Sequence, residues 1–271
     1  MLTGKSWLIK IMRIFIFAIF LLALAIPTFA QSNAQMEKEL VAGVKEIQKY
    51  GTYGGGYDEE KLSEAQDDFE KKLLKYTKTA STLSYKFAAL DEEIYIATSE
   101  DGKFRIYSWD LADGGTMHDY ARVYQYQGAD GKIYSKPDEP TEEGDYGSFV
   151  THIYTLDTKG GKIYIVCSTF IGSTKDRFQS ADLYKIDDAK LADKVKLIKT
   201  KSGLTNTLNF GYDFFSVVDR KERPIRLISF DKKTKTLKIP VVIEDTEFPS
   251  GRVTNKFISY RFNGKYFVKV S

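Results

Sequence analysis

Apolar residues follow a helical period near the start of the chain and a strand period after about residue 84. In the first region they recur at spacings of three and four, at Leu62, Ala65, Phe69, Leu73 and Tyr76. This spacing predicts a helix over 58–78 with one apolar face, because its other positions are mostly charged. We expect that face to pack on the β domain that follows. A helix of another chain is the alternative partner.

The preceding segment predicts another helix over 35–50. Residues 51–57, GTYGGGY, separate the two helices, because consecutive glycines favour no regular structure. Asp58 is suited to cap the second helix, and Glu59 and Glu60 suit the positive end of its dipole. The sequence therefore predicts one or two N-terminal helices.

From residue 84 onward the chain alternates apolar and polar positions and is rich in strong β formers. The expected strands are 84–87, 94–99, 104–109, 120–127, 132–135, 149–156, 163–170, 182–186, 195–200, 208–218, 225–230, 237–243, 255–262 and 266–270. No helices alternate with these strands, so the pattern argues against a parallel-sheet nucleotide-binding fold.

Two-residue turns that tolerate positive φ recur between the strands, as tight hairpins require. They are Asp101-Gly102, Asp130-Gly131, Gly160-Gly161 and Asn263-Gly264. The lysines that follow the first three turns lie 29 and 30 residues apart, which indicates a repeated hairpin. We expect a mainly β fold, an antiparallel meander that is sandwich-like or barrel-like. An irregular β-propeller is the alternative.

Residues 1–30 have the three parts of a secretory signal peptide. The basic residues are Lys5, Lys10 and Arg13. An apolar run over 14–26 follows them, and Thr28 and Ala30 supply the small residues before a cut at Gln31. An uncleaved membrane anchor is the alternative, since a spanning helix needs ~20 apolar residues.

The expected organisation is thus a signal peptide at 1–30, a helical segment at 31–83 packed on the β domain, and an antiparallel β domain at 84–271. Three of the 40 basic residues lie in the first segment, which leaves 37 against 37 acidic residues. A chain without net charge has no overall attraction for a polyanion, so we expect no nucleic-acid partner. The expected product is a periplasmic or extracellular monomer, free of the membrane.

Cysteine and histidine are too scarce for several chemistries. One cysteine excludes an internal disulfide, and with two histidines it excludes a zinc site rich in thiolates and imidazoles. Cys167 lies in a run that is apolar on both faces and has no charged neighbour, which favours a buried hydrophobe. A nucleophile with His152 as its base is the alternative. No phosphate-binding, dinucleotide or serine-nucleophile motif is present, and we expect no cofactor.

The segment 98–120 concentrates residues that are rare elsewhere, including the only tryptophan after residue 30. An aromatic face with a few directed hydrogen bonds suits a sugar or a peptide. The candidate ligand-binding residues are Trp109, Asp110, Asp113, Met117, His118 and Tyr120. The alternative is that Trp109 anchors the core and residues 110–115 form a tight turn.

We expect no metal site. Asp110 and Asp113 with backbone carbonyls would suit calcium, but the calcium-binding EF-hand spacing is absent. The loop 136–147 holds five carboxylates, which we interpret as solvated surface charge.

Several short strings between Phe69 and Ser135 carry a family resemblance. They are LLKY at 73–76, TSEDGKFRIYSWD at 98–110, GGTMH at 114–118, and Tyr124-Gln125-Tyr126. This region resembles an uncharacterised family of exported bacterial proteins. The resemblance implies that the helix and the hairpin form one folding unit and that export is typical. It implies no catalytic residue, because that family has no established function.

These patterns predict a non-catalytic binding or recognition domain whose ligand is a small molecule, a glycan or a peptide. One alternative is an extracytoplasmic hydrolase that acts on glycans or peptides, for which two carboxylates, or His118 and a carboxylate, must converge in a concave pocket. Another alternative is a structural protein that docks a partner through the helix 58–78.

Overall fold

The structure, a computed structural model, describes residues 31–139 and 146–270. The expected signal peptide lies outside these residues. The helices are α2 (Asn33–Tyr50), α3 (Glu59–Thr77) and α4 (Ala80–Ser84). Asp58 caps α3 as predicted, because its carboxylate accepts a hydrogen bond from the backbone N–H of Lys61 at 3.1 Å. Within the described residues, no helix combines the length and the apolar character needed to cross a membrane.

The strands that follow form three sheets. They are β1 (Tyr95–Thr98), β2 (Phe104–Asp110), β3 (Tyr120–Gln127), β4 (Ile133–Pro137), β5 (Phe149–Thr158), β6 (Gly161–Ile171), β7 (Asp176–Asp187), β8 (Lys190–Ala192), β9 (Ile198–Thr200), β10 (Gly203–Thr205), β11 (Thr207–Asp213), β12 (Ser229–Asp231), β13 (Thr236–Ile243), β14 (Arg252–Phe262) and β15 (Phe267–Val270). The sheet orders are β1-β2-β3-β4, β11-β7-β6-β5 with β8 on β7, and β10-β9-β15-β14-β13-β12.

The predicted fold class is confirmed: the chain is mainly β and its sheets are antiparallel, with a helix pair near the N-terminus. Only β9 and β15 pair in parallel among the described strands. The predicted hairpin turns have positive φ, with 68° at Gly102, 79° at Gly131, 106° at Gly161 and 98° at Gly264. No closed barrel forms within the described residues.

Four predicted strands are wrong in whole or in part, and of the stretch 195–200 only the second half is a strand, β9. Residues 84–87 form no strand, because α4 extends to Ser84 and Phe87 turns the chain with a φ of 50° to bury its ring. Strand β11 ends at Asp213, whose carboxylate caps a short 3-10 helix, η1 (Phe214–Val217), through the N–H of Phe215. In the stretch 225–230 only the last two residues pair, as the start of β12.

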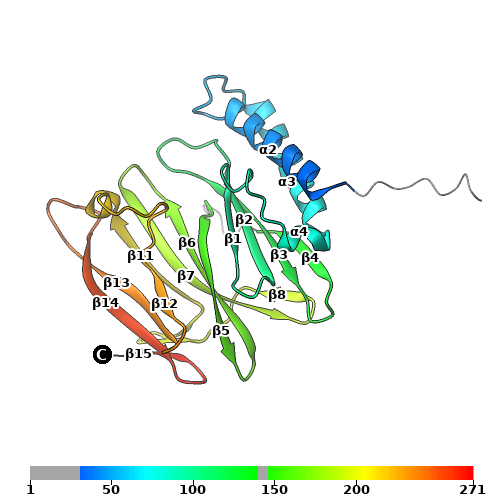
Figure 1. The fold of residues 1–271 in the computed structure, drawn as a ribbon. Coiled ribbons are helices and arrows are strands. Elements are labelled where there is room, and N and C mark those ends of the chain that lie inside the picture. Colours follow the sequence, from blue (N-terminus) through cyan, green and yellow to red (C-terminus); the bar gives the residue numbers. More distant parts are fainter. Residues whose placement is uncertain (1–30, 140–145, 271) are drawn as a thin grey trace, which may run out of the picture. The chain divides into compact units, whose positions relative to one another are not determined.

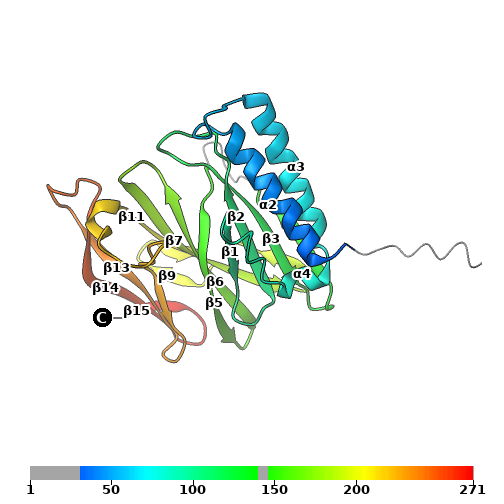
Figure 2. The ribbon, with the colours of Figure 1, turned by 45° about the horizontal axis from the view of Figure 1, so that its top comes forward.

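The sheets and the helix pair pack as successive layers. Figure 1 shows the order, from α2 and α3 through the sheet of β1–β4 and the sheet of β5–β7 to the C-terminal strands, and Figure 2 shows both helices along the face of the first sheet. A separate apolar core fills each interface between neighbouring layers. The middle sheet is therefore buried on both faces.

In strand β6, alternate residues pack against the two neighbouring sheets. Ile163, Ile165 and Cys167 belong to the core shared with the third sheet. Tyr164 and Val166, which alternate with them, belong to the core shared with the first sheet. Cys167 is a buried hydrophobe, and burial raises the pKa of its thiol well above the ordinary value.

The apolar face of α3 is buried on the first sheet. Phe69 and Leu73 are fully buried in the same core as Tyr107 and Trp109 of β2. The Phe69 ring meets the Trp109 indole edge to face, with centroids 5.0 Å apart. This contact fixes the distance between α3 and β2, and with it the space at the end of the interface.

We expect Phe69→Ala to lower the free energy of unfolding by about 3–5 kcal/mol, because it leaves a cavity between α3 and β2. Urea unfolding followed by circular dichroism measures this loss. The control is Lys71→Ala on the exposed side of the same helix, which we expect to change stability by less than about 0.5 kcal/mol. Equal stability of the two variants would show that the helix is not held through this contact.

Candidate functional site

The six predicted site residues lie where β2 ends, in the loop that follows, and where β3 begins. Asp110 and Tyr120 are paired across the two strands. Trp109 is only 2% exposed and packs in the core, as the alternative interpretation required, yet it also lines cavities beside that core. Asp113 is exposed and Met117 is half-buried.

Asp110 and His118 are brought together. The Nδ1 of His118 lies 2.5 Å from Oδ2 of Asp110, and the other carboxylate oxygen accepts from the N–H of Ala112. The imidazole lies 6.3 Å from the rings of both Tyr53 and Tyr120. This pair therefore shapes the loop between β2 and β3.

The same loop is tied to the turn between α2 and α3. The N–H of Thr52 donates to the carbonyl of Ala112 at 2.8 Å, and its hydroxyl donates to the carbonyl of Gly114 at 2.7 Å. Gly51 allows this approach, because a Cβ there would lie 2.5 Å from the Cβ of Ala112. The glycine-rich turn thus fixes one end of the predicted site segment.

The candidate site is a cleft made of two adjoining cavities that share Arg122, Tyr146 and Gly147. The first cavity, of about 300 Å³, lies between α3 and the strands β2 and β3. The second, of about 380 Å³, lies between β3 and the strands β6, β7 and β11. We call them the helix cavity and the sheet cavity. Each has the size of a small-molecule site, ~300–1,000 Å³.

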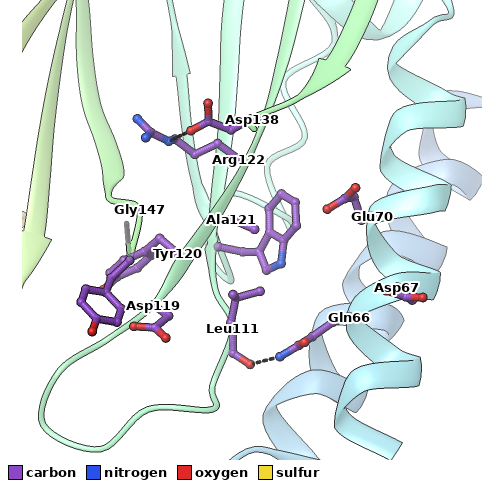
Figure 3. Close-up of a pocket in the computed structure, with 12 residues that line it drawn as sticks. Gln66, Asp67, Glu70, Leu111, Asp119, Tyr120, Ala121, Arg122, Asp138 and Gly147 are labelled. Atoms are coloured by element: carbon purple, nitrogen blue, oxygen red, sulfur yellow. Dashed lines mark hydrogen bonds and ion pairs between the residues drawn. The ribbon is translucent and has the colours of Figure 1, made fainter. Parts of the chain in front are cut away.

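Two walls of different origin enclose the helix cavity. Gln66, Asp67 and Glu70 come from α3, whereas Trp109, Leu111 and residues 119–122 come from β2, β3 and the loop between them. Figure 3 shows Glu70 extending from α3 toward the strands, with Asp119 and Tyr120 on the opposite side of the opening. The side chain of Gln66 closes the base of this space by donating to the carbonyl of Leu111.

Two buried polar atoms of the helix cavity have no hydrogen-bond partner within the described residues. One is the donor Nε1 of Trp109, and the other is the acceptor Oδ1 of Asp119. An unpaired buried polar group costs about 1–3 kcal/mol, so each is an exception that needs a reason. A bound ligand that accepts from Trp109 and donates to Asp119 would satisfy both.

The carboxylates of this cavity are held in a poorly solvated place. Burial raises the pKa of Asp119, and the nearby Asp113 and Asp110 raise it further. Burial also raises the pKa of Glu70, with a smaller contribution from Asp67. Both groups are shifted in the same direction, toward the neutral form.

Arg122 forms the boundary between the two cavities. Its side chain is mostly buried, and its Nε lies 2.7 Å from Oδ2 of Asp138 without the alignment of a hydrogen bond. Next to it, Tyr120 donates its backbone N–H to the carbonyl of Tyr146. Gly147 has a φ of 66°, and a Cβ there would lie 2.0 Å from the carbonyl oxygen of Tyr120, so this crossing requires glycine.

The sheet cavity combines a polar floor with an aromatic rim. Ser168 and Ser180 are paired across β6 and β7, their hydroxyls lie 2.8 Å apart, and Ser180 donates to the half-buried Asp182. At the rim, Tyr146 stacks on Phe170 with centroids 6.2 Å apart, and Phe170 lies 5.9 Å from Phe178. Tyr146 is 43% exposed and Phe178 is 46% exposed, so the row presents aromatic surface to solvent.

The cleft thus contains Trp109 and Tyr120 of the predicted site, while Asp110, Asp113, Met117 and His118 lie outside its lining. Asp110 and Trp109 line a separate hollow with Tyr53. The cleft residues that were not predicted include Glu70, Asp119, Arg122, Tyr146 and Phe178. In the sequence Glu70 belongs to a charged helix face and Arg122 to an ordinary strand alternation, so neither carried a signal.

No group of three or more histidine, cysteine or acidic residues in the described parts of the chain is arranged to hold a metal ion. Three of the five carboxylates of the acidic loop 136–147 lie in residues 140–145, outside the described residues. Comparison of the chain with protein-family models, curated proteins and solved structures finds no match.

Proposed function

We propose that this chain is an exported, non-catalytic protein that binds a glycan in the cleft. The observation that carries the proposal is the pair of unpartnered buried atoms in the helix cavity, the Nε1 of Trp109 and the Oδ1 of Asp119. A sugar hydroxyl can both accept and donate a hydrogen bond, so the hydroxyls of one glycan can satisfy both atoms. The exposed rings of Tyr146 and Phe178 add flat apolar surface for a sugar ring.

Binding fits the cleft better than glycoside hydrolysis does. The carboxylates of Glu70 and Asp119 line one concave cavity, which is the arrangement that a hydrolase needs. However, an acid and a base require environments that push their pKa values apart. Here burial raises the pKa of both groups, and the His118–Asp110 pair lies outside the cleft lining.

A structural role that uses the apolar face of α3 also fits less well. Leu62, Phe69 and Leu73 on that face are buried against this chain's own residues. A partner helix would have to displace them from the first sheet. We therefore propose that the protein acts as a monomer through its cleft.

Tyr146→Ala should weaken glycan binding about tenfold, which corresponds to ~1.4 kcal/mol, because it removes the ring at the junction of the two cavities. The matched control is Tyr57→Ala, which removes another exposed tyrosine from the turn between α2 and α3. A glycan array of neutral, acidic and amino sugars identifies the ligands, and calorimetry gives the affinities. The proposal fails if the unmodified protein binds no glycan on the array.

Export has its own test. We expect the protein recovered outside the cytoplasm to begin at Gln31, because Thr28 and Ala30 form the expected cleavage site. Intact-mass spectrometry of that protein measures the N-terminus. Recovery of the chain only with residues 1–30 attached and in the membrane fraction would instead support the anchor.

A further inference from the structure

The helix cavity carries unbalanced negative charge. Its lining holds four carboxylates, from Asp67, Glu70, Asp119 and Asp138, and one guanidinium, from Arg122. Asp138 is engaged by Arg122 at 2.7 Å, and Asp67 is engaged by Lys71 at 3.3 Å. Within residues 31–139 and 146–270, Glu70 and Asp119 have neither an ion pair nor a side-chain hydrogen bond. Two carboxylates thus line this space without a direct ion pair to a described residue.

An independent observation points to a ligand in the same space. The side chain of Trp109 is 2% exposed, it lines the cavity, and its Nε1 has no hydrogen-bond partner within the described residues. The Oδ1 of Asp119 is buried and equally unpartnered. The cavity therefore requires a group that donates to carboxylates next to a group that accepts from an indole N–H.

We infer that the helix cavity selects amino sugars with a free, protonated amino group over sugars that carry an acetamide or a hydroxyl at the same carbon. This inference rests on the proposed glycan binding and adds the class of glycan. Glu70 and Asp119 lie on opposite sides of the opening, so ammonium groups of different sugar rings supply the charge-assisted hydrogen bonds to them, and a sugar oxygen accepts from Trp109. The rings of Tyr120 and Tyr146 line the same cavity and favour a cation near their faces. A carboxylated sugar would meet like charges and is disfavoured.

Three β-1,4-linked trisaccharides that differ only at carbon 2 test this selectivity by calorimetry on the whole protein. They are the glucosamine trisaccharide, the N-acetylglucosamine trisaccharide and cellotriose. We expect the free amine to bind at least tenfold more tightly than either neutral sugar. That preference should shrink as the salt concentration rises from 50 mM to 500 mM. The Debye length is ~10 Å at 0.1 M and shortens with added salt, so the attraction between ammonium and carboxylate weakens.

Asp119→Asn and Glu70→Gln locate the source of the preference. Each keeps the size of its side chain and removes one negative charge, so each should reduce the preference for the amine severalfold while the affinity for cellotriose changes less than twofold. Asp193→Asn is the matched control, because this aspartate is exposed and lies outside the cleft lining. Circular dichroism establishes that the variants are folded.

The outcomes separate the inference from the proposed function. Equal binding of the three trisaccharides, or tighter binding of cellotriose, overturns the selectivity and leaves glycan binding standing. A preference that survives unchanged in both cleft variants also overturns it, because the charge then acts elsewhere. Absence of binding by all three sugars overturns the inference, and a glycan array without any bound sugar overturns the proposed function as well.

Discussion

The contact between the Phe69 ring and the Trp109 indole is the constraint on which the candidate site depends. It joins α3 to the end of β2 within the apolar core that helix and sheet share. Beside that core the walls of the cavity carry Gln66 and Glu70 on one side and Asp119 on the other. The helix cavity is therefore the polar edge of a packed interface, and the buried rings beside it hold its two walls in place.

The sheet cavity arises in a similar way between the first two sheets. Along β6, Tyr164 and Val166 belong to the shared apolar core, but Ser168 on the same face does not. On β7 the corresponding change runs from Tyr184 to Ser180. Aromatic packing thus closes one end of the interface, while short hydroxyl side chains leave space at the other. Both cavities open where apolar packing stops, and they meet at Arg122.

The sequence predicted most of the local structure because local chemistry determines it. Asp58 caps α3 through a neighbouring N–H, and Gly102 and Gly131 adopt the positive φ that tight hairpins need. The predicted strands are wrong where long-range packing determines the structure. Phe87 is apolar within an alternating segment, but it lies in a loop and its ring is buried in the core. The sequence could not predict the layering, because alternation shows that a strand has buried faces without showing what covers them.

Most cleft residues could not be predicted from the sequence, because the packing of the layers determines which side chains line the cleft. Trp109 and Tyr120 stood out because tryptophan is rare and aromatic residues are large, and both line the helix cavity. Glu70 and Asp119 are separated by the whole first hairpin, and only the packing of α3 on β2 brings them to one space. Arg122 follows the ordinary alternation of β3, so its buried position between two cavities depends on the second sheet.

The indole N–H of Trp109 reports directly on whether the helix cavity receives a ligand. Trp109 is the only tryptophan after residue 30, so in the protein that begins at Gln31 its Nε1–H gives one resonance in a proton–nitrogen correlation spectrum. On titration with the glucosamine trisaccharide, the account predicts that this resonance moves downfield and that its hydrogen exchange slows, as the N–H gains an acceptor. An unchanged resonance in protein that calorimetry shows to be saturated with the sugar would contradict the account.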